Sequence, residues 1–235
     1  MTRETKNILR YCAPFATWIG LLTVLPATAA MYAIRSVATL AVLLALFLPA
    51  RMRVPENPST VPAPNRGAAV LFGIFGGLLV FALWVGPEYW VPQRLADFYR
   101  TWFSWPLGSL PAASAEPSPY DPAVCGWPLT VAKLAGSAFV IAPVEEIFFR
   151  SFLYRWLQKR DFLSVPRTQF DLSAFVWMTG LFLLEHDRPL AAALCAVIYG
   201  FLYIRYGLLS AIVAHILTNL LLALYVIHFD LWTFW

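Results

Sequence analysis

The sequence predicts an all-α membrane protein, a multi-pass helical bundle of about seven transmembrane helices. Of its 235 residues, 60% are hydrophobic and only 13% are charged, whereas about 25% of the residues of an average soluble protein are charged. This composition leaves too little polar surface to coat a soluble globule of this length. The apolar residues also gather into segments close to the ~20 residues that a helix needs to cross a bilayer. The lipid bilayer is therefore the expected environment.

Seven apolar segments follow one another along the chain. The first follows a basic N-terminal stretch with no small-residue cleavage site and soluble domain after it, so we interpret it as a retained span rather than a signal peptide. The second, fifth and sixth are short for a full crossing. The expected spans are 11–32, 36–50, 67–87, 133–157, 172–187, 189–204 and 207–228.

Two polar or proline-rich stretches separate these segments. Residues 51–66 are rich in Pro, Arg and Asn and predict a loop, while residues 88–128, rich in proline and aromatic residues, predict a longer interfacial excursion. No internal repeat or low-complexity tract is present. We therefore divide the chain into residues 1–128, with the N-terminal transmembrane helices and the interfacial loop, and residues 129–235, a four-helix transmembrane core.

Basic residues predict the orientation in the membrane. Positive residues favour the cytoplasmic side of short loops. Ten of the seventeen fall on the side of the N-terminus and five on the other, with Arg150 and Arg155 inside a helix. The N-terminal side carries Arg3, Lys6, Arg10, Arg51, Arg53, Arg66, Lys159, Arg160, Arg167 and Arg205, and the other side carries Arg35, Arg94, Arg100, Lys133 and Arg188. We therefore expect a cytoplasmic N-terminus in a cell membrane, the bacterial inner membrane.

Charge and cysteine content exclude other classes of protein. The net charge is +4, but the basic residues lie scattered at the ends of apolar segments and form no patch interleaved with aromatic residues, which argues against nucleic acid as a partner. The three cysteines, Cys12, Cys125 and Cys195, have no CxxC spacing, so neither a structural disulfide nor a zinc knuckle is expected.

Polar residues inside the apolar spans are the candidates for function. An ionisable group there costs roughly 2.5–3.5 kcal/mol on insertion scales, so it usually persists for a reason. Glu146 and Arg150 are four residues apart on one helix face, as are His215 and Asn219. Glu145 is rotated about a third of a turn from Glu146, so the two carboxylates can take different partners. We expect Arg150 to hold Glu146 while Glu145 faces a cavity.

The depth of these residues in the membrane is consistent with a single site. At about 1.5 Å per helical residue, Glu145, His186, His215 and Asn219 lie about 15 to 22 Å along their helices from the charged residues that end them on one side. Pro143, two residues before Glu145, cannot donate a backbone hydrogen bond, which loosens the helix where a water can enter. Residues from three helices thus fall within one slab of the membrane.

Three motifs in this region resemble those of a known family. Glu145-Glu146-Ile147-Phe148-Phe149-Arg150 matches EExxxR, Phe182-Leu183-Leu184-Glu185-His186 matches FxxxH, and His215-Ile216-Leu217-Thr218-Asn219 matches HxxxN. In this order on successive spans, over roughly residues 130–225, they resemble the CAAX prenyl protease and bacteriocin-processing (CPBP) family of intramembrane glutamic endopeptidases. The closing stretch, from Ala214 to Tyr225, also resembles the CAAX-protease-related proteins that accompany exosortase sorting systems.

The resemblance implies peptide-bond hydrolysis of a membrane-associated protein or peptide, without a cofactor. It implies that Glu145 and His186 activate a water and that His215 and Asn219 support the oxyanion. Glu146 with Arg150 fixes the helix and the local field, and Phe182 positions His186 one turn away. Residues 129–235 would then be the catalytic core, with a possible functional link to a sorting or secretion system.

Each of these assignments has a structural alternative. Glu146 and Arg150 form an ion pair that can simply hold helices together, and His215 with Asn219 can be interhelical hydrogen-bonding residues. His186 can be an interfacial histidine and Lys133 can extend its ammonium to the membrane surface. Two histidines and two glutamates can also hold Zn²⁺, which would activate the water itself. Because HExxH is absent and no third histidine joins them, we favour a site without metal.

Two alternatives for the whole chain remain open. A non-proteolytic membrane scaffold or partner of a sorting system could keep the same fold and polar cluster. A transporter is less consistent with the sequence, because no Gly/Pro-broken pair of helices occurs in matching halves. The face to which the site opens is also open: the charge bias puts the cluster nearer the outer face, whereas prenyl-processing relatives act on cytoplasmic substrates.

Overall fold

The computed structural model describes residues 2–47, 65–103 and 118–235, and in these ranges every regular element is helical. The all-α bundle predicted from composition is therefore confirmed. The predicted loop at 51–66 lies outside the described residues except for its last two positions, and α3 begins at Arg66. The described parts of the 88–128 excursion form two short helices, α4 (Gln93–Phe103) and α5 (Pro122–Cys125).

Five described helices are long and apolar enough to cross a membrane, and they correspond to five of the seven expected spans. The other two expected spans differ. Over 172–187 the apolar helix α9 (Leu172–Leu183) has only 12 residues, and over 11–32 the helix α1 (Arg3–Val24) begins among charged residues. The five spans are α2 (Ala29–Phe47), α3 (Arg66–Tyr89), the continuous helix Trp127–Gln158, α10 (Pro189–Tyr206) and α11 (Leu208–Phe229).

Pro26 sets the boundary between the first two helices, and the expected boundary near residue 33 is wrong. Leu25 has an extended backbone (φ −98°, ψ 142°), which is the conformation that a following proline favours. Thr28 then accepts a hydrogen bond at 3.3 Å from the backbone N–H of Met31, which helps α2 begin at Ala29. The apolar run continues through this turn, so hydropathy alone placed the first span too late.

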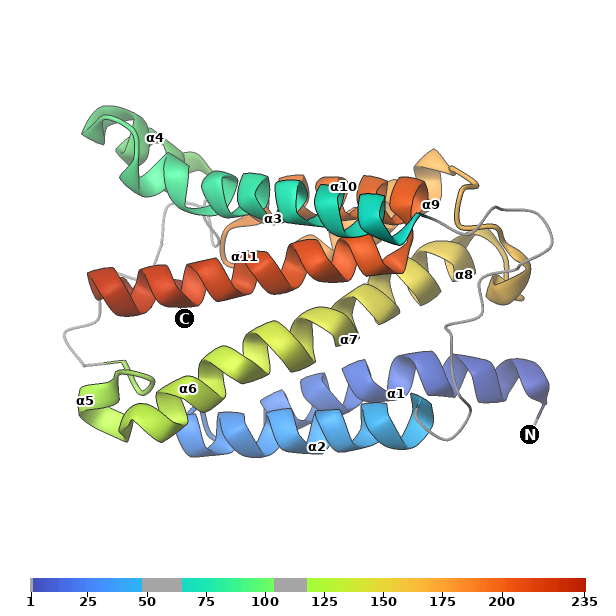
Figure 1. Ribbon diagram of the computed structural model, residues 1–235, viewed down its shortest axis with the longest axis horizontal. Helices are drawn as coiled ribbons and strands as arrows, with labels where there is room; N and C mark the ends of the chain where they lie inside the picture. Colours follow the sequence, from blue (N-terminus) through green and yellow to red (C-terminus); the bar gives the residue numbers. More distant parts are fainter. Residues whose placement is uncertain (1, 48–64, 104–117) are drawn as a thin grey trace.

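The helix Trp127–Gln158 runs obliquely between two groups of helices (Figure 1). The pair α1 and α2 lies on one side of it, and α3, α10 and α11 lie on the other. Its α-helical parts are α6 (Trp127–Ala135), α7 (Ala142–Glu146) and α8 (Tyr154–Gln158), separated by the π-helical segments η1 (Gly136–Ile141) and η2 (Ile147–Leu153). Two short 3₁₀ segments, η3 (Phe162–Ser164) and η4 (Trp232–Phe234), complete the described elements.

Glycines bring α3 against α11, the helix that carries the HxxxN motif. A Cβ on Gly73 would lie 2.8 Å from the carbonyl oxygen of Ser210, and a Cβ on Gly77 would lie 2.7 Å from that of Ala214. Small residues spaced in this way let helix backbones approach closely in membranes. Because the two backbones lie so close, the hydroxyl of Thr218 on α11 can donate a hydrogen bond to the carbonyl of Gly77 on α3 at 3.1 Å.

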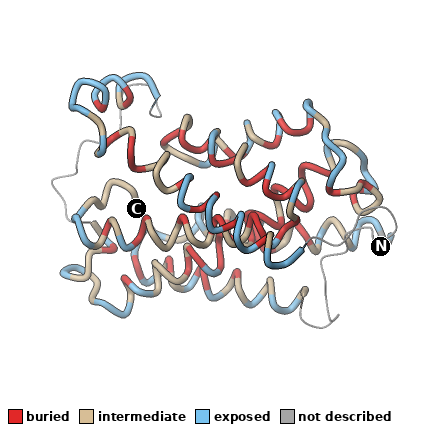
Figure 2. Tube along the Cα trace, turned by 45° about the horizontal axis from the view of Figure 1, so that its top comes forward, coloured by how far each residue is buried: buried red, intermediate tan, exposed pale blue. Residues whose placement is uncertain are grey.

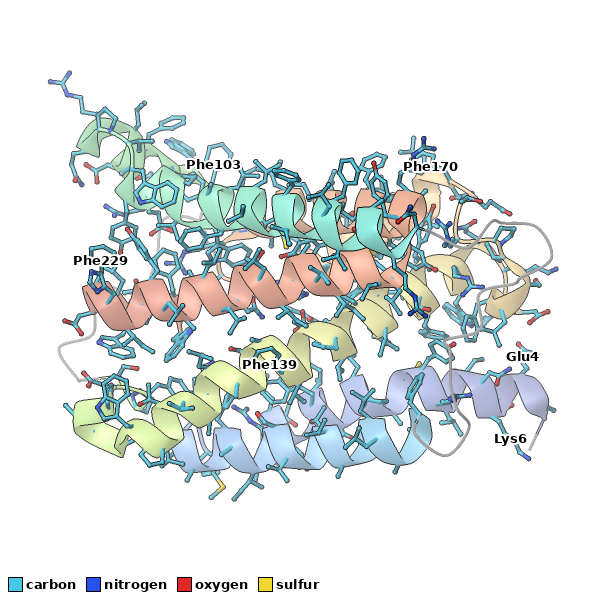
Figure 3. The ribbon with its side chains drawn as sticks, viewed as in Figure 1. Glu4, Lys6, Phe103, Phe139, Phe170 and Phe229 are labelled. Carbon is cyan, nitrogen blue, oxygen red and sulfur yellow. The ribbon has the colours of Figure 1, made fainter. Side chains whose placement is uncertain are left out.

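The outer surface is apolar. Buried residues concentrate on the inward faces of the helices (Figure 2), while large hydrophobic side chains are exposed around the bundle. Phe139, Phe170 and Phe229 project away from it (Figure 3) and are each more than half exposed. An exposed apolar surface of this extent suits lipid and would be unstable in water.

Candidate active site

The EExxxR motif lies on α7 and η2, in the middle of the oblique helix. The π-helical segment η1 ends just before Pro143, and its last hydrogen bond runs from the N–H of Ala142 to the carbonyl of Ser137. Proline has no N–H with which to continue an α-helical ladder, and π-helical turns of this kind are frequent at functional sites. The local loosening expected at Pro143 is thus present as a π-helical segment.

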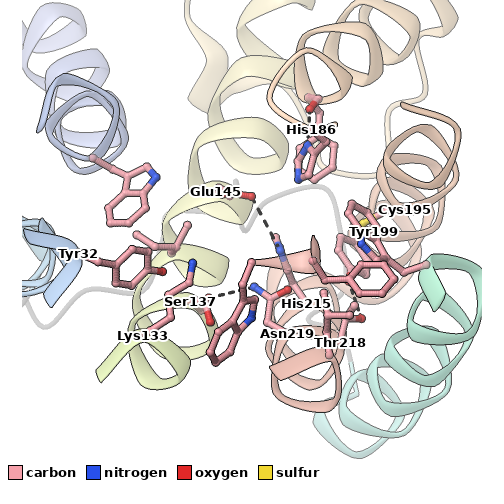
Figure 4. Close-up of a pocket in the computed structure, with 17 residues that line it drawn as sticks. Tyr32, Lys133, Ser137, Glu145, His186, Cys195, Tyr199, His215, Thr218 and Asn219 are labelled. Carbon is pink, nitrogen blue, oxygen red and sulfur yellow. Dashed lines mark hydrogen bonds and ion pairs between the residues drawn. The ribbon is translucent and has the colours of Figure 1, made fainter. Parts of the chain in front are cut away.

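A cavity of about 240 Å³ lies beside this part of the helix. Figure 4 shows Glu145, His186, His215 and Asn219 around it, on three separate parts of the bundle. All four residues predicted as catalytic therefore line one cavity. The other lining residues are Trp18, Tyr32, Trp84, Lys133, Ser137, Ile141, Phe182, Cys195, Tyr199, Thr218, Leu222, Phe234 and Trp235.

Glu146 lies behind the cavity and binds two partners. Its Oε1 is 3.1 Å from Nη1 of Arg150 and 2.9 Å from Nδ1 of His215. Glu146 and Arg150 are fully buried, and the guanidinium of Arg150 also lies over the ring of Phe182, 4.5 Å from its centroid. The predicted pair between Glu146 and Arg150 is therefore present, and it extends to a histidine on another helix.

Glu145 lies on the side of the His215 ring opposite to Glu146. Its Oε2 lies 3.9 Å from Nε2 of the imidazole. This separation exceeds that of a direct hydrogen bond. A carboxylate oxygen accepts, so Nδ1 of His215 donates to Glu146. In the neutral tautomer that this bond selects, Nε2 is the acceptor that faces Glu145 and the cavity. The sequence paired Glu145 with His186 in activating the water, and it did not predict that His215 also lies beside Glu145.

His186 follows the short helix α9 and is oriented by its own motif partner. Its Nδ1 lies 2.9 Å from the carbonyl oxygen of Phe182. A carbonyl only accepts, so Nδ1 carries the proton and Nε2 is left as an acceptor. The rings of the two residues lie 4.6 Å apart, and Phe182 is fully buried. Phe182 thus contacts His186 through both its ring and its backbone.

Asn219 is fixed through the π-helical segment. Its Nδ2 donates to the carbonyl of Ser137 at 3.0 Å. A carboxamide nitrogen carries two hydrogens, so one N–H remains for another acceptor. At the preceding position of α11, the hydroxyl of Thr218 receives a hydrogen bond from Tyr199 at 2.7 Å. These bonds fix the face of α11 that carries His215 and Asn219.

Some lining residues were not predicted from the sequence. Lys133 was expected to reach the membrane surface, but it lines the cavity, with its Nζ 4.1 Å from the centroid of the Tyr32 ring. Phe234 and Trp235, which the sequence did not single out, also line the cavity. For Lys133 the spacing gave no signal, because twelve residues at α-helical pitch would turn it about 120° from Glu145 and only the π-helical segment between them changes this. Residues 234 and 235 carried no signal either.

The arrangement brings together one cavity-facing carboxylate, two imidazole acceptors and one amide donor. Within the described ranges, no three His, Cys, Asp or Glu side chains are grouped as a metal site would require. A carboxylate beside a partly enclosed cavity can act as a general base towards a water, and an amide donor can stabilise an oxyanion. The geometry is thus suited to hydrolysis of a carbonyl compound.

Comparison with known proteins gives one match. Residues 127–221 match the family model described as type II CAAX prenyl endopeptidase Rce1-like. This range contains all three motifs, so the resemblance to the CPBP family is confirmed there. The narrower likeness to the exosortase-associated branch stays a prediction. No curated protein shows significant similarity to the chain, and neither does any solved structure.

Proposed function

We propose, from the membership of residues 127–221 in the CAAX prenyl endopeptidase family, that this membrane protein is an intramembrane glutamic endopeptidase. Its substrate is a membrane-associated protein or peptide, and the attacking water is activated by Glu145. The observation that carries the proposal is the cavity in which Glu145, His186, His215 and Asn219 meet, with Glu145 within 4 Å of an imidazole nitrogen.

Glu145 acts as the general base. A water held beside its Oε2 gives one proton to the carboxylate as the water oxygen adds to the carbonyl carbon of the scissile peptide bond. His186 and His215 line the same cavity. The acceptor nitrogen of either ring can accept a hydrogen bond from the remaining hydrogen of the water. The position of His215 follows from Glu146, which binds its Nδ1.

Asn219 supports the charge that develops on the carbonyl oxygen. One N–H of its side-chain amide donates to the carbonyl of Ser137. The other N–H is free to donate to the oxyanion of the tetrahedral intermediate. The intermediate collapses as the C–N bond breaks, and protonated Glu145 returns its proton to the leaving nitrogen. The products are a new carboxylic acid, which retains the second hydrogen of the water and can release it to solvent, and a new amine, and Glu145 is restored for the next cycle.

The decisive experiment compares the membrane proteome of cells that carry the wild-type protein with that of cells that carry Glu145→Gln. We expect one membrane-associated protein to change in length, with equal amounts of the two variants in the membrane. Glu4→Gln is the matched control, because Glu4 is an exposed carboxylate in the first turn of α1 and does not line the cavity. Unchanged processing in the Glu145→Gln cells would favour the scaffold interpretation and contradict the protease.

The location of the cavity bears on the substrate. Its lining extends from Glu145 on α7 to Lys133 on α6 and to Phe234 and Trp235 near the C-terminus. Figure 1 shows α6 towards the end of the bundle opposite the N-terminus. With the N-terminus in the cytoplasm, as the distribution of basic residues favours, the cavity opens to the outer side of a bacterial inner membrane. A substrate handled by a sorting or secretion system would be accessible there. Labelling of a single cysteine at position 235 with a membrane-impermeant thiol reagent tests this orientation.

A further inference from the structure

Lys133 places a positive charge in the cavity without a carboxylate beside it. Its Nζ lies over three aromatic rings, 4.1 Å from the centroid of Tyr32, 4.7 Å from that of Tyr120 and 5.7 Å from that of Trp235. In residues 2–47, 65–103 and 118–235, no Asp or Glu forms an ion pair with Lys133. Aromatic faces attract an ammonium but leave its charge uncompensated.

A second cation flanks the same tyrosine. Arg35 on α2 is buried, and its guanidinium carbon lies 5.3 Å from the centroid of Tyr32 and 4.9 Å from that of Trp18. Its Nε and Nη1 are enclosed and have no hydrogen-bond partner among the described residues. Two like charges beside one ring repel each other, and both have lost water, so an anion between them would be strongly favoured.

Other buried arginines of the bundle show the contrast. Arg150 has Glu146 at 3.1 Å, and Arg188 has Glu88 at 2.6 Å. Arg155 is buried too, and its guanidinium donates to three backbone carbonyls. The end of the cavity near Lys133 differs from the Arg150 and Arg188 sites, because no carboxylate among the described residues pairs with either of its two cations. Arg35 has the hydroxyl of Tyr120 as a neutral neighbour instead.

The distance between Lys133 and Glu145 indicates how long a peptide must be to reach from one residue to the other. Both residues lie on the helix Trp127–Gln158, and twelve residues at about 1.5 Å each separate their backbones by about 18 Å. An extended peptide covers up to about 3.3–3.6 Å per residue, so about five residues span this distance. The cavity wall between them is continuous, since Ser137 and Ile141 line it on the same helix.

We propose that Lys133, with Arg35 behind it, forms a subsite that binds a carboxylate of the peptide substrate, about five extended residues from the bond that Glu145 cleaves. The carboxylate is either the C-terminus of the peptide or the side chain of an aspartate or glutamate. The subsite selects acidic peptides over neutral ones and fixes their direction along the cavity. This inference rests on the proposed peptidase function.

Peptide binding to an inactive protein tests the subsite apart from cleavage. The full chain carrying Glu145→Gln is placed in nanodiscs of zwitterionic phosphatidylcholine and titrated with three fluorescent octapeptide pools of Leu, Ala and Ser. One pool has a free C-terminal carboxylate, one is C-terminally amidated, and one is amidated but contains one glutamate. Lys133→Met and Lys133→Arg are added to this background, and Lys159→Met serves as a control outside the cavity.

We expect one or both carboxylate pools to bind about 10- to 100-fold more tightly than the amidated neutral pool, as for hydrogen bonds to charged groups. Lys133→Met should remove this difference, and Lys133→Arg should restore most of it. Preference for the free-acid pool identifies a C-terminal carboxylate, and preference for the glutamate pool identifies a side chain.

Three results would overturn the subsite. One is equal binding of all three pools, and another is a preference that survives Lys133→Met. The third is competition by anionic lipid, in which phosphatidylglycerol in the nanodisc abolishes the preference and would make the ligand a lipid phosphate. If Lys133→Met lowers the melting temperature, the comparison rests on Lys133→Arg and Arg35→Lys, which keep the charge. Failure of the protease proposal is seen separately, as absent processing by the wild-type protein.

Discussion

Nδ1 of His215 lies 2.9 Å from Oε1 of Glu146, a residue 69 positions away in the sequence. The same oxygen is 3.1 Å from Nη1 of Arg150, so one buried carboxylate connects the EExxxR motif to the HxxxN motif. An ion pair that only held the oblique helix together would not need the imidazole. The contact makes Glu146 a positioning residue for His215, whose other nitrogen faces Glu145.

Glu146→Gln should therefore lower kcat more than it changes KM. We expect a loss of roughly 10²-fold or more, because a misoriented imidazole no longer assists proton transfer. The variant should also be less stable by about 3–5 kcal/mol, since Arg150 is left as an uncompensated buried charge. Steady-state kinetics on a fluorogenic peptide, together with thermal unfolding in the same detergent, measure both effects.

The double variant Glu146→Gln/Arg150→Met separates positioning from stability. Removing both charges should recover much of the stability, while kcat stays low because His215 still lacks its carboxylate. Recovery of kcat together with stability would mean that the pair serves the fold alone.

Glu145→Gln should abolish proteolysis, whereas Asn219→Ala should only weaken it. Glu145 is the one carboxylate among the described residues that line the cavity, whereas the loss of one oxyanion donor typically costs about 10²–10³ in rate. His215→Ala is expected to fall between these limits. Purified variants with similar melting temperatures should be assayed on one peptide, and near-wild-type turnover by Glu145→Gln would exclude it as the base.

Activity should survive strong chelation, and the purified protein should contain less than stoichiometric zinc. A catalytic zinc ion would be needed for its bound water to ionise near neutral pH, so its removal would stop the reaction. The measurement is dialysis of the detergent-solubilised protein against a chelator, metal analysis by mass spectrometry, and assays before and after zinc is returned. Activity that disappears and returns with zinc would recast Glu145, His186 and His215 as ligands.

Gly77→Ala should destabilise the protein and reduce its activity. The new Cβ would lie 2.7 Å from the carbonyl oxygen of Ala214, a backbone atom that cannot rotate away. Overpacking of this kind costs about 1–3 kcal/mol, and here it displaces the part of α11 next to His215. Gly180→Ala is the matched control, because nothing lies within 4 Å of its added Cβ, and its melting temperature should be equal or higher. Equal melting temperatures for the two variants would contradict the close approach of α3 and α11.

The sequence predicted the convergence of the four candidate catalytic residues because helical spacing is regular. Counting from the charged ends of the spans placed Glu145, His186, His215 and Asn219 at similar depth, and all four line one cavity. Rotation about the helix axis separated Glu145 from Glu146, and the structure pairs Glu146 with Arg150 while Glu145 faces the cavity. Both results need only the pitch of an α-helix.

Other features depend on contacts between helices, which hydropathy does not encode. The turn at Pro26 lies within a continuous apolar run. The close packing of Gly73 and Gly77 against α11 follows from the absence of side chains, which a scan for chemical groups passes over. The inward position of Lys133 depends on the aromatic rings of α2 and the C-terminal segment.

The π-helical segment Gly136–Ile141 also sets the rotational phase between the two ends of the cavity. A π-helical turn holds one residue more than the α-helical turn it replaces, so it acts as a one-residue insertion in the helical register. At about 100° per residue, twelve steps of an uninterrupted α-helix would turn Lys133 about 120° from Glu145, whereas the extra residue in the π-helical turn leaves the equivalent of eleven steps, or about 20°. Converting Gly136–Ile141 to regular α-helix at unchanged length would therefore turn the two residues to different sides of the oblique helix.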